Sequence, residues 1–521
     1  MKIITAKKAA ELIQNNMTVG VDGFGGWSCA DTILKAIGRR YHEEKEPSAL
    51  TAVCGISPGA LKNDDWGLSH LKEEGLLKGI IAAHVGMPPA IGQAVGADEV
   101  EGFMMPLGVI SSLYRAMAAK KPGVITTVGL HTFADPRQEG CKVNQKAKVS
   151  NREMVRIMEI NGDEYLFYPT FKMDACILRG TYADENGCIS LSEEALTACQ
   201  LEMAEAVHNN GGLVFIQVNQ IVKSGTLSAR DVHIHGNLVD YVVLADKEDQ
   251  VQGYDFPDAF RSELLGDVKV PLSSVLPMKL DVRKVIGRRG AMELRQGDVI
   301  NLGIGMPDGV ANVANEEGIL DGLTLAIESG LIGGVPVGGA GLGASVNPES
   351  IMYLADNFDL YDGGFLDMTF LGAAEIDACG NVNVSRFGSR VVGPGGFIDI
   401  SQNTENVYFM GTFTAGKSEI KVEDGKLHII KDGDKIKFKK TINQITFSAK
   451  YARQVKQNVH FITERAVFSL GENGLCLDEI APGVDLQRDI LDKMEFTPEI
   501  SLNLKEMDVR IFKDAVMNLK G

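Results

Sequence analysis

A glutamate that directly follows a short apolar segment is the first residue in this sequence to which chemistry can be assigned. Residues 323–327 are rich in β-forming side chains and predict a buried parallel strand, and Glu328-Ser329-Gly330 follows at once. Glycine-rich segments stand on both sides, at 303–305, 333–334, 338–339 and 395–396. Open α/β sheets bind ligands at the carboxyl ends of their strands. Glu328 is therefore a candidate nucleophile with backbone amides nearby, although a strand-end glutamate with a structural role fits the spacing equally well.

The composition is that of a soluble globular protein with more than one domain. A chain of 521 residues is too long for one core, and 45% apolar and 23% charged residues are ordinary values. The net charge of −17 argues against non-specific binding to nucleic acid or to an anionic membrane, because both attract basic surfaces. An anionic ligand must then be held by local Lys or Arg side chains or by backbone amides.

Disulfides, a metal site and membrane insertion are not predicted. The eight cysteines form no Cys-x-x-Cys pair and show no disulfide or zinc spacing. His233 and His235 share one strand face, but no third ligand stands at a familiar spacing. The N-terminus lacks the apolar core of a signal peptide, and no apolar run approaches the ~20 residues that span a bilayer. We expect a cytoplasmic protein with reduced thiols.

Two segments of the chain repeat the same pattern. Residues 10–23 align with residues 292–305 without a gap, which places Gly23 on Gly305. Each copy predicts a helix, a turn, a buried strand and a glycine-bearing turn. A second pair, 184–191 and 377–384, predicts a hairpin turn followed by a strand in each half. Two echoes in the same order indicate a duplicated α/β unit.

The duplication also predicts the domain organisation. Two prolines and a pair of serines mark a linker at 271–281, between an N-terminal domain at 1–270 and a C-terminal domain at 282–521 that carries Glu328. The predicted fold class is α/β, with two duplicated open α/β domains packed face to face. The interface between two such domains is a natural cleft for a ligand.

The tail of the second half has its own pattern. Residues 419–430 alternate around Asp424-Gly425 and predict an exposed hairpin. Residues 487–494 and 506–519 predict helices.

Two nucleotide-binding motifs match by letter but lack their structural context. Residues 411–418 fit the P-loop pattern, yet β-alternation follows Lys417 where a phosphate-binding helix must begin. Residues 339–344 fit the dinucleotide fingerprint, but no strand leads into them. We expect no nucleotide at either segment and interpret 339–344 as a close-approach loop.

Taken together, these features resemble the family I coenzyme A transferases, and most of all the single-chain propionate or acetate CoA-transferases. The resemblance covers nearly the whole chain and rests on residues 21–26, 303–307, 328–336 and 393–400. The first half is similar to the α subunit and the second half to the β subunit of two-subunit members. Glu-Ser-Gly at 328–330 replaces the Ser-Glu-Asn-Gly of the succinate-using members, and the first-half glycine signature is incomplete. Both departures favour the propionate branch.

The resemblance implies a short-chain acyl-CoA:carboxylate CoA-transferase that works by ping-pong exchange through a glutamyl-CoA thioester on Glu328. Coenzyme A is then a substrate and covalent intermediate, and no permanently bound cofactor or metal is expected. An exposed glutamate has a pKa of about 4.3, so it is ionised at neutral pH without a base to activate it. The resemblance also implies a homo-oligomer, either a tetramer or a dimer.

Glycines complete the site that the resemblance implies. The backbone amides of Gly395 or Gly396 are the candidates for an oxyanion hole, where one donor contributes roughly 3 kcal/mol. The glycines expected to line the CoA and substrate site are Gly23, Gly25, Gly26, Gly303, Gly305, Gly338 and Gly339. Simple turn glycines are the alternative interpretation.

Three other activities stay open at this point. An acyl-CoA hydrolase would use the same Glu328 with water as the final acceptor. An ATP-dependent acyl-CoA ligase would depend on residues 411–418, and a CoA-binding sensor would show no turnover. Acetate, propionate, butyrate, lactate and acrylate all remain candidate acids, and the Lys and Arg side chains that hold the CoA phosphates are not singled out by the sequence.

Overall fold

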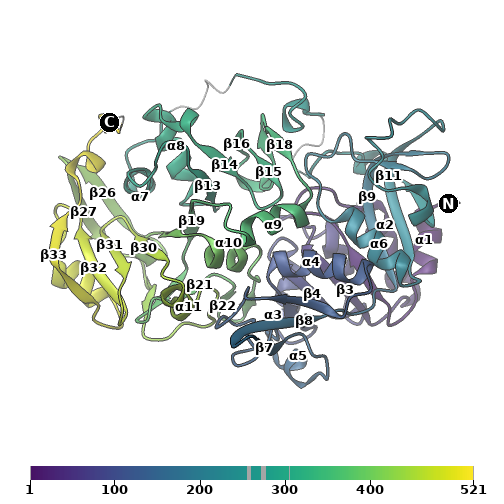
Figure 1. The fold of residues 1–521 in the computed structure, drawn as a ribbon, viewed down its shortest axis with the longest axis horizontal. Helices are drawn as coiled ribbons and strands as arrows, with labels where there is room; N and C mark the ends of the chain where they lie inside the picture. The colour runs from purple at the N-terminus through teal and green to yellow at the C-terminus, as the bar shows by residue number, and fades with distance from the viewer. Residues whose placement is uncertain (1, 255–259, 272–276, 304, 520–521) are drawn as a thin grey trace. The chain divides into compact units, whose positions relative to one another are not determined.

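Helices and parallel strands alternate along the chain, as the sequence predicts for the α/β class (Figure 1). The computed structural model describes residues 2–254, 260–271, 277–303 and 305–519. Their contacts define a first unit of Met1–Val270, Ile327–Leu360 and Ser385–Asp399, and a second unit of Pro271–Ala326, Tyr361–Val384 and Ile400–Gly521. The unit that contains the first half of the sequence therefore also takes in two segments of the second half. The domain limits at 270 and 282 stay a prediction about the repeated halves, and part of the linker lies outside the described residues.

A parallel sheet forms the centre of the first unit. Its strands are neighbours in the order β1, β12, β11, β9, β2, β3, β4 and β5, and each neighbouring pair is parallel. Their bounds are β1 Lys2–Ile4, β2 Thr18–Val21, β3 Leu50–Ile56, β4 Leu77–His84, β5 Glu101–Met104, β9 Ala175–Asp184, β11 Leu213–Val222 and β12 Tyr241–Leu244. The central strands are buried along most of their length, which explains their continuous apolar sequences.

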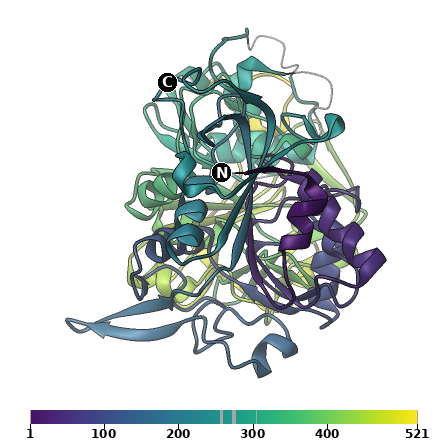
Figure 2. The same ribbon diagram turned by 90° about the vertical axis from the view of Figure 1, so that its right-hand side faces the viewer.

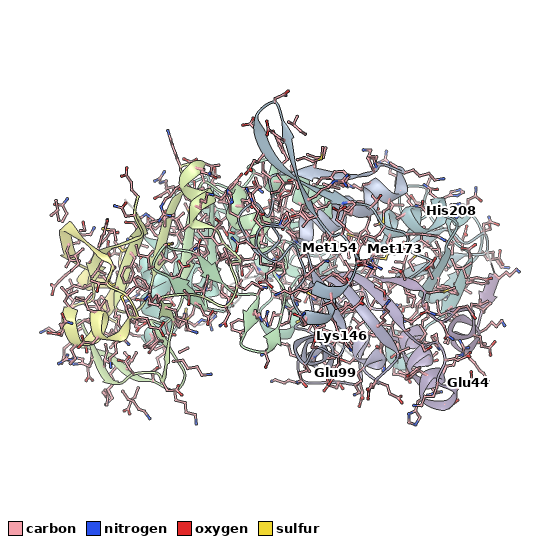
Figure 3. All side chains as sticks on the ribbon, turned by 90° about the horizontal axis from the view of Figure 1, so that it is seen from below. Glu44, Glu99, Lys146, Met154, Met173 and His208 are labelled. Atoms are coloured by element: carbon pink, nitrogen blue, oxygen red, sulfur yellow. The ribbon has the colours of Figure 1, made fainter. Side chains whose placement is uncertain are left out.

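Helices connect the strands of the first unit and cover its sheet. The bounds are α1 Ala6–Leu12, α2 Asp31–Glu44, α3 Pro89–Gly96, α4 Leu107–Ala118, α5 Gln145–Val149, α6 Gln200–Asn209 and α9 Leu354–Asp362, of which the last begins in this unit. Helix α4 packs on β3 and β4, α6 packs on β9 and β11, and the two helices contact each other. Figure 3 labels both buried and exposed side chains of this unit. Met154 and Met173 are buried, whereas Glu44, Glu99, Lys146 and His208 are exposed.

Short antiparallel elements complete the first unit. Strands β6 (Gly123–Thr126), β7 (Arg156–Ile160) and β8 (Asp163–Pro169) form a small sheet, and its β7–β8 hairpin extends away from the parallel sheet (Figure 2). The remaining pairs are β15 (Leu331–Ile332) with β18 (Ser350–Ile351), β16 (Val335–Pro336) with β17 (Ser345–Val346), and β22 (Arg386–Phe387) with β23 (Arg390–Val391).

A second sheet has most of its strands in the second unit. Neighbouring strands follow in the order β14, β13, β19, β24, β30, β31, β32 and β33. Their bounds are β13 Val299–Leu302, β14 Thr324–Ala326, β19 Met368–Gly372, β24 Asn406–Met410, β30 Asn458–Ile462, β31 Ala466–Leu470, β32 Leu475–Ile480 and β33 Glu499–Glu506. The helices are α7 Val282–Ala291, α8 Asp308–Glu316, α10 Phe397–Asn403, which ends in this unit, and α11 Ala449–Gln454. Its core includes the stacked rings of Phe370 and Tyr408, whose centroids are 4.9 Å apart.

The order of strands explains the first internal repeat. Strand β2 follows α1, and β13 follows α7. In the sheets, β2 lies between β3 and the later strand β9, and β13 lies between β14 and the later strand β19. Strand order thus reverses between β2 and β9 in one sheet and between β13 and β19 in the other. Doubly wound sheets bind ligands at this reversal, at the carboxyl ends of the strands. The aligned glycines Gly23 and Gly305 lie two residues after β2 and three residues after β13.

The second repeated pattern forms the same turn in both units. The Asp184 carboxylate accepts the N–H groups two and four residues later, each at 2.9 Å. Asp377 accepts the N–H groups two and four residues later at 2.9 Å as well. Antiparallel pairs flank both turns, β9 with β10 (Ile189–Ser190) and β20 (Glu375–Asp377) with β21 (Val382–Asn383). The two predicted hairpin turns are confirmed.

The tail of the chain contains the predicted hairpin, changes the type of one predicted helix and contradicts the other. The hairpin expected at 419–430 is present as β26 (Glu419–Glu423) and β27 (Lys426–Lys431). Strand β26 follows Lys417 where a P-loop would need a helix, as the β-alternation in the sequence predicts. The helix predicted at 487–494 is present, as a π-helical turn, Leu486–Ile490, followed by a 3₁₀ turn, Leu491–Lys493.

The helix predicted at 506–519 is wrong. Strand β33 runs to Glu506, and only a 3₁₀ turn, Val509–Phe512, follows it. The buried Arg288 guanidinium donates to the carbonyl oxygens of Ile511 at 3.2 Å and Ala515 at 3.0 Å, and also to those of residues 510 and 513. Because a tertiary partner satisfies these carbonyls, the segment does not need the internal hydrogen bonds of a helix.

None of the helices in the described part of the chain has the length and apolarity that a bilayer crossing requires.

Candidate active site

Glu328 lies in a tight turn directly after β14, where the sequence places it. The Gly330 N–H donates to the Ile327 carbonyl at 3.0 Å, and the Ile327 N–H donates to the Leu331 carbonyl at 2.9 Å. Gly330 has a φ of +104°, and a Cβ there would stand 2.3 Å from the Met352 carbonyl oxygen. Only glycine closes this turn without strain. We call residues 327–330 the nucleophile turn.

A backbone N–H meets the Glu328 carboxylate. The Gly396 N–H donates to Glu328 Oε2 at 3.2 Å. The Gly395 N–H, in contrast, donates to the Ala83 carbonyl at 2.9 Å. Of the two glycines predicted as oxyanion donors, only Gly396 therefore directs its N–H toward Glu328. A Cβ on Gly396 would stand 2.4 Å from Glu328 Oε2, so the approach needs a glycine here.

The protonation state of Glu328 differs from the prediction. The sequence leads to an ordinary pKa of about 4.3, but the residue is half-buried, and burial raises the pKa of Glu328 to about 7. Desolvation disfavours the charged carboxylate, and the hydrogen bond from Gly396 offsets only part of this effect. Glu328 is thus divided between acid and carboxylate at neutral pH.

The end of β4 holds the segment that carries Gly396. The Val85 N–H donates to the Val392 carbonyl at 2.8 Å, next to the bond between Gly395 and Ala83. His84 stands at the same strand end, where burial, with a smaller effect of the Arg390 charge, lowers its pKa to about 4. His84 is therefore neutral at physiological pH and brings no positive charge to this strand end.

The first-half glycine turn and the nucleophile turn both contact residues 342–343. The Trp27 indole N–H donates to the Leu342 carbonyl at 2.9 Å, and the Phe24 ring would lie 2.7 Å from a Cβ on Gly343. The Ser329 hydroxyl donates to the Gly343 carbonyl. Residues 339–343 form a 3₁₀ turn and its exit, with no strand–turn–helix context, so the interpretation as a close-approach loop agrees with the structure.

The other predicted glycines occupy different surroundings. Gly23 packs near Pro58, Gly25 near Met87, and the Gly26 carbonyl accepts the Tyr254 N–H at 2.8 Å. A Cβ on Gly338 or Gly339 would meet nothing within 4 Å, so these two stand beside open space. Gly303 and Gly305 belong to the second unit, where the Gly303 N–H donates to the Phe370 carbonyl at 2.7 Å. A role of these seven glycines in binding stays a prediction.

Two residues of interest were missed in the sequence. Asp22 follows β2 directly, and its buried carboxylate accepts the Cys199 N–H at 3.1 Å. Burial raises the pKa of Asp22 to about 7 against the effect of its backbone hydrogen bonds. The second residue, Asn357 in α9, contacts the nucleophile turn. The strand-end position could have drawn attention to Asp22, as it did to Glu328, but no local pattern marks Asn357.

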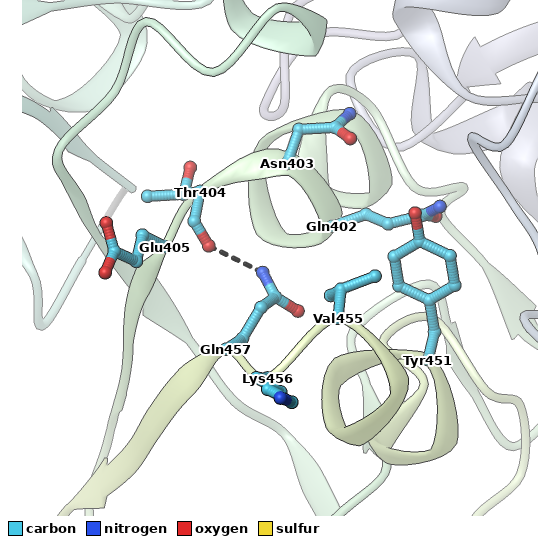
Figure 4. A pocket seen from close by; sticks show the side chains of 8 residues that line it. All are labelled: Gln402, Asn403, Thr404, Glu405, Tyr451, Val455, Lys456 and Gln457. Atoms are coloured by element: carbon cyan, nitrogen blue, oxygen red, sulfur yellow. Dashed lines mark hydrogen bonds between the residues drawn. The ribbon is translucent and has the colours of Figure 1, made fainter.

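A hollow of about 300 Å³ in the second unit is separate from these residues (Figure 4). It is lined by Gln402, Asn403, Thr404, Glu405, Tyr451, Val455, Lys456 and Gln457. Several of these precede β24 and β30, so the hollow lies at the amino ends of these strands rather than at the carboxyl ends. It contains none of the predicted site residues.

The two histidines considered for metal binding have main-chain partners. His233 Nδ1 lies 2.9 Å from the Asp231 carbonyl oxygen, and His235 Nδ1 accepts the Asn237 N–H at 3.3 Å. Within the described ranges of the chain, no group of three or more His, Cys, Asp or Glu side chains is placed to hold a metal ion.

Known proteins similar to this chain point to one family. The family model described as coenzyme A transferase matches residues 3–245. The caffeate CoA-transferase of Acetobacterium woodii is 44% identical over 526 residues, which cover 98% of each protein. The acetate CoA-transferase YdiF of Escherichia coli K12 is 41% identical over 517 residues, or 99% of this chain and 96% of the relative.

A solved structure resembles the chain over almost its full length. It is the acyl-CoA transferase YdiF from Escherichia coli O157:H7, described as a thioester complex with CoA. Its TM-score to this chain is 0.92 with 39% sequence identity, and the match covers 99% of this chain and 97% of the other.

Proposed function

Because the chain belongs to the coenzyme A transferase family, we propose that it exchanges coenzyme A between short-chain acyl-CoA thioesters and carboxylic acids, with Glu328 as the nucleophile. The observation that carries this proposal is the Glu328 carboxylate at the end of β14, 3.2 Å from the Gly396 N–H. A carboxylate with one preorganised donor has the parts that acyl transfer needs. The thioester complex described for the 39% identical structure supports a covalent route.

The proposed reaction proceeds by two exchanges on Glu328. The carboxylate attacks the carbonyl carbon of acyl-CoA, which gives a mixed anhydride and releases the CoA thiolate. The thiolate then attacks the glutamyl carbonyl, which gives a glutamyl-CoA thioester and frees the first acid as its carboxylate. A second carboxylate reverses both steps, so the thioester is conserved and no ATP is needed. The kinetics are ping-pong.

Gly396 is the proposed oxyanion donor in these steps. Each attack places negative charge on a carbonyl oxygen, and a preorganised N–H at that position contributes about 3 kcal/mol. Gly395 is not proposed as a second donor, because its N–H is bonded to Ala83. Coenzyme A itself is the only cofactor in this scheme, as substrate and covalent intermediate.

The acids to test follow from the sequence and from the relatives. The sequence resemblance suggests propionate and acetate as acids to test. The relatives' names support acetate and add caffeate. The partial burial of Glu328 supports transfer over hydrolysis, because bulk water would hydrolyse the anhydride. The oligomeric state and the cytoplasmic location stay predictions.

Peptide mass spectrometry tests the proposal. The protein is mixed with acetyl-CoA or propionyl-CoA without an acceptor acid, digested, and searched for a CoA adduct localised by fragmentation. We expect the adduct on Glu328 and its absence from Glu328→Gln, whereas Glu349→Gln, which changes an exposed glutamate of the same unit, should keep it. Steady release of CoA from an unmodified protein would instead establish the hydrolase, and an adduct on another residue would remove Glu328 as the nucleophile.

A further inference from the structure

The peptide between Glu328 and Ser329 is the central peptide of the nucleophile turn. The two hydrogen bonds that close the turn use Ile327, Gly330 and Leu331, so they leave this peptide free to rotate. Rotation of the central peptide is what separates type I from type II β-turns. Because Glu328 belongs to this peptide, its rotation changes the direction in which the carboxylate leaves the backbone.

Asn357 fixes this peptide from outside the turn. Its side chain has 0% exposure, and its Nδ2 donates to the Glu328 carbonyl at 3.2 Å and to the Ile327 carbonyl at 3.4 Å. Both acceptors are carbonyl oxygens, so the amide nitrogen rather than the amide oxygen must face the turn. A single side chain thereby holds the carbonyls of two successive residues, the second of which is the nucleophile.

Helix α9, which carries Asn357, is tied to helix α4. Arg115 of α4 forms ion pairs with Asp359 at 2.8 Å and with Asp356, both in α9. The first residue of α4 is also bonded to the segment that carries Gly396, because the Leu107 N–H donates to the Gly395 carbonyl at 3.0 Å. The two helices thus connect the backbone of Glu328 to the N–H group that meets its carboxylate.

We propose that Asn357 is a positioning residue for Glu328, which acts by holding the central peptide of the nucleophile turn. The proposal rests on the function proposed above, because it concerns the attack by Glu328. The fully buried Asn357 side chain acts on the backbone of the turn, and its amide keeps the carboxylate against the Gly396 N–H. A displacement of about 1 Å in a reacting group lowers a rate by roughly 100-fold. The loss should appear in the rate of adduct formation and not in the KM for acyl-CoA.

Three variants test the proposal by rapid-quench measurement of the CoA adduct from propionyl-CoA. Asn357→Leu keeps the size and removes the donor, and we expect roughly 100-fold slower adduct formation with an unchanged KM. Asn357→Asp donates only when protonated and repels the two carbonyls when ionised. Its rate relative to the native protein should therefore rise as the pH is lowered from 8 to 6.

Asn144→Leu is the matched control. The Asn144 side chain is also buried and donates to two carbonyls, of Val95 at 2.9 Å and Val100 at 2.7 Å, far along the chain from the nucleophile turn. Because the Asn144 amide oxygen also accepts the Gly102 and Ala147 N–H groups, this variant should lower the melting temperature at least as much as Asn357→Leu does, without slowing adduct formation in the folded protein.

The outcomes separate this proposal from the function on which it rests. A folded Asn357→Leu that forms the adduct at the native rate overturns the positioning role and leaves the transferase intact. If Asn357→Leu fails to fold, a pH-independent ratio between Asn357→Asp and the native protein overturns it. A native protein that forms no adduct at Glu328 with either acyl-CoA overturns the proposed function itself.

Discussion

Glu328 combines two requirements that oppose each other, because the burial that keeps water from an acyl intermediate also disfavours the reactive carboxylate. Burial raises its pKa to about 7, so the ionised fraction grows as the pH rises through neutrality. We expect the single-turnover rate of adduct formation at saturating acyl-CoA to increase about tenfold per pH unit below 7 and to level off above it. A rate that is constant from pH 5.5 to 8 would contradict this pKa.

Gly396 should tolerate no side chain. A Cβ would stand 2.4 Å from Glu328 Oε2 and 2.8 Å from the Phe358 ring, so alanine must displace either the carboxylate or the ring. We expect Gly396→Ala to slow adduct formation by at least about 100-fold, measured as above on the folded protein, and to lower the melting temperature, because the buried Phe358 ring must shift. Gly372→Ala is the comparison, because a Cβ there meets nothing within 4 Å. Equal rates for the two variants would remove Gly396 from the site.

At the scale of elements, the sequence predicted what local chemistry determines. The strand before Glu328, the two Asp-x-x-Gly turns and the hairpin at Asp424-Gly425 all follow from residues that are neighbours in the chain. Glu328 and Gly396 were predicted as candidate site residues from the family motifs to which they belong. Asn357 could not be predicted, because its partners lie 29 and 30 positions away and nothing in the sequence of α9 marks them. The pKa of Glu328 depends on burial and was missed for the same reason.

Arg288 shows the converse case, in which a tertiary contact overrides a local preference. Its guanidinium holds four carbonyls of residues 510–515, a segment with a helical pattern that does not fold as a helix. We expect Arg288→Met to lower the free energy of unfolding by about 3 kcal/mol, because buried carbonyls lose a charged donor. It should also expose the last residues to protease.

A surface arginine is the control for that experiment. The side chain of Arg488 is 72% exposed and pairs with Asp489 at 2.7 Å. Arg488→Ala should change the free energy of unfolding by less than about 1 kcal/mol. If both variants behaved alike in denaturant unfolding and in limited proteolysis, Arg288 would not be what holds the C-terminal segment.

At the scale of the whole molecule, the internal repeat predicted the fold class and the two sheets. It did not predict which segments of the chain belong to each compact unit. The repeat describes how each half folds, but the first unit also contains residues 327–360 and 385–399 from the second half. These segments bring Glu328 and Gly396 into a unit otherwise built from the first half. Side chains of the first half hold them, as Trp27 does at Leu342 and Thr197 does at the Met352 carbonyl, 2.8 Å away.

This arrangement predicts that the two halves need each other but not the peptide bond between them. Residues 1–270 and 271–521, expressed together as separate chains, should assemble one to one and form the Glu328 adduct within about tenfold of the native rate. Cutting the chain leaves the hydrogen bonds of the first unit intact and costs mainly the entropy of association. Residues 1–270 alone should aggregate, because removal of 327–360 and 385–399 uncovers buried apolar surface. The measurement is size-exclusion chromatography with adduct mass spectrometry, and halves that elute separately as folded monomers would show that the first unit does not depend on the second half.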